Sequence, residues 1–195
     1  MKIHIIPEPN KITVTDKIVF ELTRLCNLNE QKGCSKAFSE LTGFISDEFC
    51  IELLGTGKEE IRLSLDEALT APESYTLDIT ENLIEIKGAD EAGLFYGAET
   101  LKQIFLQCEE KLPEVHIEDA PAYSYRGFML DCGRYFFPKE DVMKFIDVMA
   151  MHKLNHFHWH LTEDQGWRAQ MLDNILLTEI GAYRSHTNFG VKPHG

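Results

Sequence analysis

One short segment of the sequence concentrates residue types that bind metals and transfer protons. HKLNHFHWHLTEDQGWR, residues 152–168, contains four of the eight histidines of the chain, both tryptophans and an adjacent acidic pair. Imidazole and carboxylate groups at this density are typical of a metal site or of a general acid–base site. The segment leaves three alternatives: a metal site, a catalytic site, or a strand end that lies beside one.

Three histidines of this segment alternate with apolar residues. If residues 154–161 form a strand, then His156, His158 and His160 point to one face, and Glu163 follows close to them. These side chains are of the types that ligate zinc, but alternate strand positions lie about 6–7 Å apart. One straight strand rarely brings three imidazoles onto one ion. The favoured alternative is that the histidines form hydrogen bonds inside a polar interior.

The acidic pair and an upstream arginine are the other candidates. Neighbouring residues of an extended segment face opposite sides, so Glu163 and Asp164 are not expected to meet one substrate atom. We expect one functional and one structural carboxylate. Arg134 follows a predicted strand end and is either paired internally or a clamp for hydroxyl groups or anions. Both tryptophans are expected in the core, and for Trp167 a sugar-stacking surface is the alternative.

A predicted strand–helix–strand unit positions these candidates. YRGFMLD, residues 125–131, is a short apolar run, and Pro138 suits the first turn of the helix that follows. Residues 154–161 form the next strand, parallel to the first. The expected buried face of the helix has the spacing i, i+3, i+4, i+7: Val142, Phe145, Ile146 and Met149. Polar residues follow both strands, and in β/α barrels this end of the strands binds substrates.

Residues 1–119 have a different pattern, in which strands and helices are mixed. Strands are predicted at residues 49–55, 60–65, 74–80 and 83–88, and helices at residues 34–41 and 94–105. The last two strands form a hairpin around Glu81 and Asn82, and Asp90 caps the second helix. This order predicts a small α+β layer with one covered sheet face.

Charge and cysteine content limit the classes of function. The chain has 19 Lys and Arg against 32 Asp and Glu, a net charge of −13, which argues against nucleic-acid binding. Residues 1–119 hold 11 and 24 of these, whereas residues 120–195 hold 8 and 8, which suggests two units of different purpose. Five scattered cysteines, no signal peptide and no long apolar run predict a reduced, cytoplasmic protein without a membrane span.

Most of the chain resembles one enzyme family. Residues 125–168, from YRGFMLD to DQGWR, are similar to the opening of the catalytic barrel of glycoside hydrolase family 20, the β-N-acetylhexosaminidases, and LTEIGAYR continues the match. IIPEPNKI and ADEAGLFYGAETLKQIF resemble the α+β domain that precedes this barrel. The resemblance implies a non-catalytic α+β domain at residues 1–119. It also implies the first β/α units of a TIM-type (β/α)8 barrel, truncated, at residues 120–195.

The resemblance further implies an activity and roles for three residues. Members of the family hydrolyse terminal N-acetyl-β-glucosaminides or galactosaminides by a substrate-assisted retaining mechanism, without a cofactor or metal. Arg134 matches the arginine that binds sugar hydroxyls. Glu163 matches an acidic position, often Asp, that supports a histidine behind the catalytic acid, and Asp164 follows it without an assigned role. Gly133-Arg134-Tyr135 departs from the common Ser-Arg-His, which alters the surroundings of the arginine.

The catalytic Asp-Glu pair of the family follows a Gly-Gly on a later strand. Here Asp-Glu occurs only at residues 47–48, 66–67 and 90–91. A whole barrel takes about 250 residues, and about two of its eight strands are recognisable here. We therefore expect an N-terminal piece that is inactive by itself. The alternatives are a folded module that binds a partner or self-associates through the open barrel edge, and, less favoured, a histidine-rich zinc site.

Overall fold

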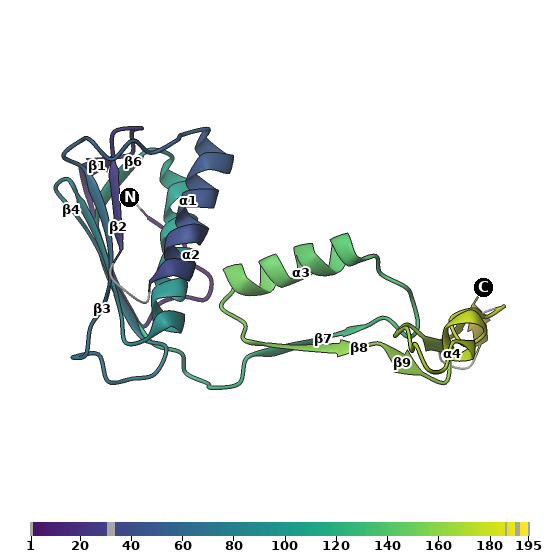
Figure 1. Ribbon diagram of the computed structural model, residues 1–195. Coiled ribbons are helices and arrows are strands. Elements are labelled where there is room, and N and C mark those ends of the chain that lie inside the picture. The colour runs from purple at the N-terminus through teal and green to yellow at the C-terminus, as the bar shows by residue number, and fades with distance from the viewer. Residues whose placement is uncertain (1, 31–33, 186, 190–191, 195) are drawn as a thin grey trace. The chain divides into compact units, whose positions relative to one another are not determined.

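The computed structural model describes residues 2–30, 34–185, 187–189 and 192–194 (Figure 1). The chain divides into two compact units. The first comprises Met1–Ser124 together with Met151–Lys153, and the second comprises Tyr125–Ala150 and Leu154–Gly195. None of the described helices combines the length and the apolar composition that a membrane crossing requires.

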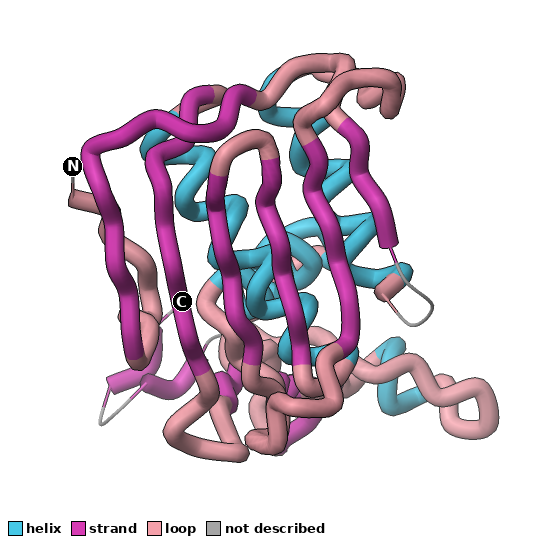
Figure 2. Tube along the Cα trace, turned by 90° about the vertical axis from the view of Figure 1, so that its left-hand side faces the viewer, coloured by secondary structure: helices cyan, strands magenta, loops and turns pink. Residues whose placement is uncertain are grey.

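A six-stranded sheet forms the body of the first unit (Figure 2). In spatial order its strands are β1 (Lys11–Glu21), β6 (Lys111–Asp119), β4 (Tyr75–Thr80), β5 (Leu83–Gly88), β3 (Glu60–Leu65) and β2 (Asn27–Glu30). The first four strands pair antiparallel with one another, whereas β3 runs parallel to both β5 and β2. The predicted hairpin is confirmed, and Asn82 in its turn has the positive φ of 60° that such turns favour.

Two helices, α1 (Ser35–Phe49) and α2 (Glu91–Cys108), cover one face of this sheet (Figure 1). The predicted cap of α2 is confirmed, because the Asp90 carboxylate accepts a hydrogen bond of 2.8 Å from the Gly93 amide. The apolar faces of α2 and of the central strands form a core without solvent exposure: Leu94, Ala98, Leu101, Phe105, Leu77, Ile79, Ile84, Ile86 and Ile117. The predicted one-sided α+β layer is therefore present.

One predicted strand of the first unit is wrong. Residues 49–55 contain no strand; Phe49 is the last residue of α1, and Cys50 ends the helix in the left-handed conformation. The predicted helix at residues 34–41 is thus too short. Leu41, Ile45 and Phe49 repeat at four-residue spacing, and the Phe49 ring packs edge-on against Phe105 at 5.7 Å. Packing between the helices extends α1 beyond its predicted end to Phe49, the first residue of the predicted strand, and residues 50–55 that follow form neither a helix nor a strand.

The second unit begins with the predicted parallel pair. β7 (Gly127–Asp131) and β8 (His156–His160) are joined through α3 (Lys139–Met151). The Phe145 ring on α3 lies 4.6 Å from Phe128 on β7 and 6.4 Å from Phe157 on β8, so α3 covers the phenylalanine face of the pair. The alternate residues, including His156, His158 and His160, belong to the other face.

The remaining elements of this unit are short. They are β9 (Thr162–Glu163), β10 (Gly166–Trp167), α4 (Leu176–Glu179), β11 (Thr187–Phe189) and β12 (Lys192–His194). β9 pairs with β10, and β11 pairs with β12, both antiparallel.

Two core predictions for the second unit are wrong. Val142 and Met149 are buried as expected, but Ile146 is 44% exposed. Trp159 is 45% exposed, although its indole N–H lies 3.2 Å from the Cys132 sulfur. Apolar periodicity marks the side chains that can be buried, whereas burial itself depends on which neighbours are present.

Candidate functional site

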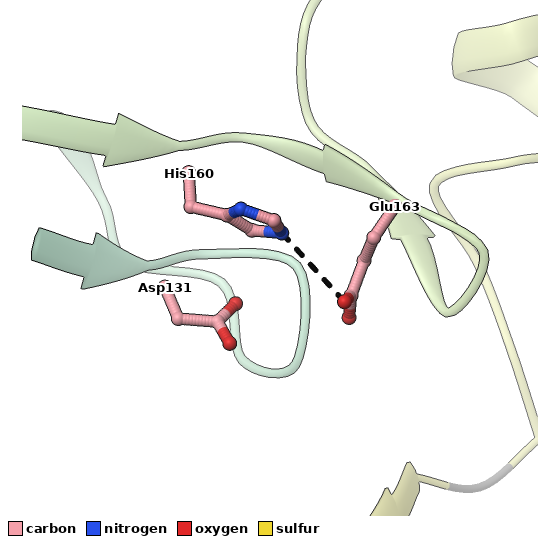
Figure 3. A group of neighbouring side chains, drawn as sticks. All are labelled: Asp131, His160 and Glu163. Carbon is pink, nitrogen blue, oxygen red and sulfur yellow. Dashed lines mark ion pairs between the residues drawn. The ribbon is translucent and has the colours of Figure 1, made fainter.

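The carboxyl ends of β7 and β8 bring polar side chains together at one edge. The two strands are parallel and in register, so that Asp131, the last residue of β7, lies opposite His160, the last residue of β8. Glu163 follows on β9, three residues after His160. Figure 3 shows these three side chains converging on one space. Strand ends of this kind carry the ligand-binding groups of parallel β/α folds.

Asp131 organises the turn that follows β7. Its Oδ1 accepts hydrogen bonds from the backbone N–H groups of Gly133, at 2.9 Å, and Arg134, at 3.2 Å. Its Oδ2 lies 2.6 Å from Nη1 of the Arg134 side chain. Burial opposes ionisation here, but the backbone and side-chain hydrogen bonds from Arg134, together with its charge, outweigh it. They hold the pKa of Asp131 below its usual range.

Arg134 is bound by two carboxylates through a single nitrogen. Nη1 lies 2.6 Å from Asp131 Oδ2 and 2.5 Å from Glu163 Oε2. The hydrogen bond to Asp131 and the nearby acidic charges raise the pKa of the guanidinium above its ordinary value. Nε and Nη2 make no hydrogen bond to any of the described residues, and about a third of the side chain is exposed. Arg134 therefore keeps N–H donors for a ligand while its charge is balanced.

His160 and Glu163 form the second contact of the site. His160 Nε2 lies 3.6 Å from Glu163 Oε2, an ion-pair distance too long for a hydrogen bond (Figure 3). His160 Nε2 and Glu163 Oε1 are both inaccessible to solvent and lack a hydrogen-bond partner within the described part of the chain. Buried polar atoms are nearly always satisfied, so this pair marks a polar space that a ligand group can complete.

The acidic neighbours Glu163 and Asp164 separate as an extended segment requires. Glu163 faces the guanidinium of Arg134, and only 11% of its side chain is exposed. Asp164 is exposed and acts on Arg134 through its charge. Glu163 is thus part of the site through its contact with Arg134, whereas Asp164 contributes only the negative charge of an exposed carboxylate nearby.

The histidines do not converge as the zinc alternative requires. The rings of His158 and His160 are 6.3 Å apart, while His156 stacks on Tyr125 at 4.5 Å and contacts Asn155. The described residues contain one group with metal-ligand geometry: Asp131, His160 and Glu163 offer ligand atoms within 4.8 Å of one another. The Arg134 guanidinium contacts both carboxylates of that group and supplies the positive charge that they face.

Asp131 was not assigned a role from the sequence, and His160 was considered only as one of three histidines of a zinc site or of a polar interior. A signal for them is present, because Asp131 ends the strand predicted at residues 125–131, His160 lies one residue before the end of the strand predicted at residues 154–161, and parallel strand ends meet at one edge. Trp167, expected in the core or at a sugar-stacking surface, is half-buried, and its indole N–H donates to Ala169 O at 2.6 Å.

Comparisons with known proteins agree along the whole chain. A family profile described as "Glycosyl hydrolase family 20, domain 2" matches residues 2–120, and "Glycosyl hydrolase family 20, catalytic domain" matches residues 123–195. A beta-hexosaminidase of Porphyromonas gingivalis is 38% identical over 94% of this chain and 26% of its own length. One from Vibrio furnissii is 33% identical over 92% of this chain and 30% of its own length.

Solved structures give the same result. A GH20 exo beta-N-acetylglucosaminidase from Vibrio harveyi, in complex with N-acetylglucosamine, matches with a TM-score of 0.81 at 29% identity, covering 98% of this chain and 32% of that one. The beta-N-acetylhexosaminidase from Bacteroides fragilis gives 0.78 at 32% identity, covering 92% and 37%. The chain spans between a quarter and two fifths of the length of these four proteins. It belongs to glycoside hydrolase family 20.

Proposed function

We propose that these 195 residues serve a β-N-acetylhexosaminidase, in which Arg134 binds the hydroxyl groups of a terminal N-acetylglucosamine or N-acetylgalactosamine. The observation that carries this proposal is the position of Arg134 at the ends of two parallel strands. Its Nη1 is bound by Asp131 and Glu163, while Nε and Nη2 have no partner among the described residues. A planar guanidinium fits two adjacent hydroxyls, and an ammonium does not offer the same fork.

The two compact units have different proposed roles. The first unit is a non-catalytic domain, and the second is the start of the catalytic barrel. Each Asp-Glu pair of the sequence lies in the first unit, and two of the three pairs have local structural contacts. Asp90 caps α2, and Asp66 accepts a hydrogen bond from the Ala68 amide. Family members use such a pair on a later strand to orient the acetamido group and to protonate the leaving oxygen.

We expect the 195-residue chain by itself to leave a chromogenic N-acetyl-β-glucosaminide intact, because none of its Asp-Glu pairs belongs to the second unit, where a barrel strand would carry the catalytic pair. An extended protein, in which these residues are followed by the remaining strands of the barrel, is expected to hydrolyse it. Release of the chromophore by both proteins is compared with release by buffer. Turnover by the short chain contradicts the assignment of the catalytic pair. An extended protein that contains the pair and releases no chromophore contradicts the substrate class.

Self-association of the isolated chain is a separate proposal. Apolar side chains that are more than 40% exposed are frequent in the second unit: Phe128, Met129, Met143, Ile146, Val148, Trp159, Leu172, Ile175, Leu176 and Ile180. Exposed apolar surface of this extent favours association. A monomer mass of 22.4 kDa in sedimentation at both low and high concentration contradicts it. The cytoplasmic location stays a prediction from the sequence, which cell fractionation tests.

A further inference from the structure

Two further arginines of the second unit bind the turn that carries Arg134. Nε of Arg168 donates to the main-chain carbonyl of Cys132 at 3.0 Å, and Nη1 of Arg184 donates to the carbonyl of Gly133 at 2.8 Å. These two carbonyl groups lie between Asp131 and Arg134 in the chain. The Asp131 carboxylate therefore binds the N–H groups of this turn, and the two guanidinium groups bind its carbonyl groups.

Each guanidinium also binds a second segment. Arg168 donates from Nη1 to the carbonyl of Ala182, and Arg184 donates from Nη1 to the carbonyl of Gln165, both at 2.5 Å. The β9–β10 hairpin, which contains Gln165, also supplies Glu163. The same two side chains thus join the turn of Arg134 to the hairpin that presents its second carboxylate, and to the chain around Ala182.

Gly166 shows how closely these groups are packed. It is buried, and a side-chain carbon added there would come within 2.6 Å of the Gly133 carbonyl oxygen and 2.9 Å of Arg184 Nη1. It would also lie 3.0 Å from Arg168 Nη2. Only a glycine lets the hairpin approach the turn this closely, because any Cβ would displace the arginines or the carbonyl.

We propose that Arg168 and Arg184 are positioning residues for Arg134: by binding the carbonyls of Cys132 and Gly133, they keep Arg134 Nη1 between Asp131 and Glu163. The effect of these residues on catalysis rests on the proposed function, since Arg134 is the group proposed to bind the sugar. The geometry itself is independent of substrate, and it is testable in the 195-residue chain.

The two arginines differ in which nitrogens they use, and this difference can distinguish an effect of hydrogen-bond geometry from an effect of positive charge. Arg168 reaches its two carbonyls from two different nitrogens, Nε and Nη1, which an ammonium group cannot imitate. The bonds of Arg184 to the carbonyls of Gly133 and Gln165 both come from Nη1, so one ammonium nitrogen with three donors can make both of them. We therefore expect Arg184→Lys to keep Arg134 in place and Arg168→Lys to release it, although both variants conserve charge.

Nitrogen-detected NMR of the Arg134 guanidinium measures this directly. In the unaltered chain, the two carboxylates on Nη1 should slow rotation of the guanidinium about its Nε–Cζ bond, so that Nη1 and Nη2 give separate signals. We expect separate signals in Arg184→Lys and a merged signal in Arg168→Lys. Arg24→Gln, which alters an exposed arginine of the first unit, is the matched control and should leave the signals separate.

The outcomes distinguish the inference from the proposed function. The positioning role is overturned if both Arg168→Lys and Arg168→Gln give separate Nη1 and Nη2 signals while their amide spectra show a folded protein. This holds whether or not the extended protein is active. Merged signals in Arg168→Lys beside an intact amide spectrum support it. In the extended protein, the same variant should then raise KM about tenfold or more with a smaller change in kcat. A third outcome is that Arg168→Lys gives merged signals but the unsubstituted extended protein is inactive. That outcome supports the positioning role and contradicts the proposed function.

Discussion

Replacing Lys153 with methionine is expected to lower the free energy of unfolding of the first unit by about 3–5 kcal/mol, the usual cost of removing one partner of a buried ion pair. Lys153 is 5% exposed, and its Nζ lies 3.0 Å from Asp119 Oδ2 and 2.8 Å from the Tyr75 hydroxyl. The Asp119 side chain is 13% exposed. Without the ammonium group, Asp119 keeps a negative charge away from water.

The surroundings of Asp119 cannot replace this cation. Its Oδ1 accepts from the amides of Asn10 and Ala120, and its Oδ2 accepts from the Tyr75 hydroxyl at 3.0 Å. Burial, together with the charge of Asp119, raises the pKa of Tyr75, so this hydroxyl stays protonated and neutral. Lys153 follows α3 in the chain but belongs to the first compact unit. That unit is thus completed by a residue from beyond its own contiguous segment.

Urea unfolding followed by far-ultraviolet circular dichroism measures this effect, and tryptophan fluorescence separates it from the second unit, where both tryptophans lie. The matched control is Lys36→Met, because Lys36 pairs with Glu91 at 3.1 Å but is 74% exposed, and we expect a change below about 1 kcal/mol. The double variant Lys153→Met with Asp119→Asn should recover part of the loss, since no buried charge then remains. A loss in Lys153→Met no larger than that in Lys36→Met contradicts the prediction.

The parts of the fold that could be predicted carry local signals. The β4–β5 hairpin has strict alternation and a turn residue suited to positive φ, and α2 has a capping aspartate. No strand was predicted at β1 or β6. β1 is an edge strand with register shifts between Val14 and Phe20, so its burial does not alternate cleanly, and β6 contains Pro113. Their pairing depends on contacts between residues about a hundred positions apart, which no local pattern records.

The candidate site divides in the same way. Arg134 and Glu163 could be proposed because each lies next to a predicted strand end and matches a family motif. Their contact with each other, and with Asp131, depends on the register of β7 and β8 and on the closure of the β9–β10 hairpin. The bonds from Arg168 and Arg184 to main-chain carbonyls connect residues 36 and 51 positions apart. Carbonyl groups are common to all residues, so the sequence carries no mark of these partners.

Arg134→Lys in the extended protein is expected to lower kcat/KM for an N-acetyl-β-glucosaminide by about 10- to 100-fold, the effect of losing charge-assisted hydrogen bonds to substrate. Lysine can keep a cation between Asp131 and Glu163, but it lacks the Nε and Nη2 donors that Arg134 leaves without a partner among the described residues. Folding should therefore persist while sugar binding is lost. Arg134→Met should lower kcat/KM by at least as much as Arg134→Lys does, because it removes the positive charge as well as the N–H donors.

The titration of Asp131 separates these two variants. Arg134 holds the pKa of Asp131 below its ordinary value, so the stability that this contact contributes is present above the ordinary pKa and is lost as the pH falls through the lowered one. In Arg134→Met the pKa of Asp131 should rise towards or above its ordinary value, whereas in Arg134→Lys it should stay lowered. Carbon-13 NMR of the carboxyl group follows both variants in the 195-residue chain.

Kinetics of the extended protein then decide whether Arg134 binds substrate. Lys144→Gln is the control, because Lys144 lies on α3 with 78% of its side chain exposed and should change kcat/KM less than twofold. If Arg134→Lys retains kcat/KM within twofold of the unaltered enzyme while Asp131 keeps its lowered pKa, Nε and Nη2 do not bind the sugar. Arg134 would then be an internal ion pair. A loss confined to KM indicates binding that is equal in the ground and transition states, whereas a loss in kcat indicates contacts that strengthen as the glycosidic bond breaks.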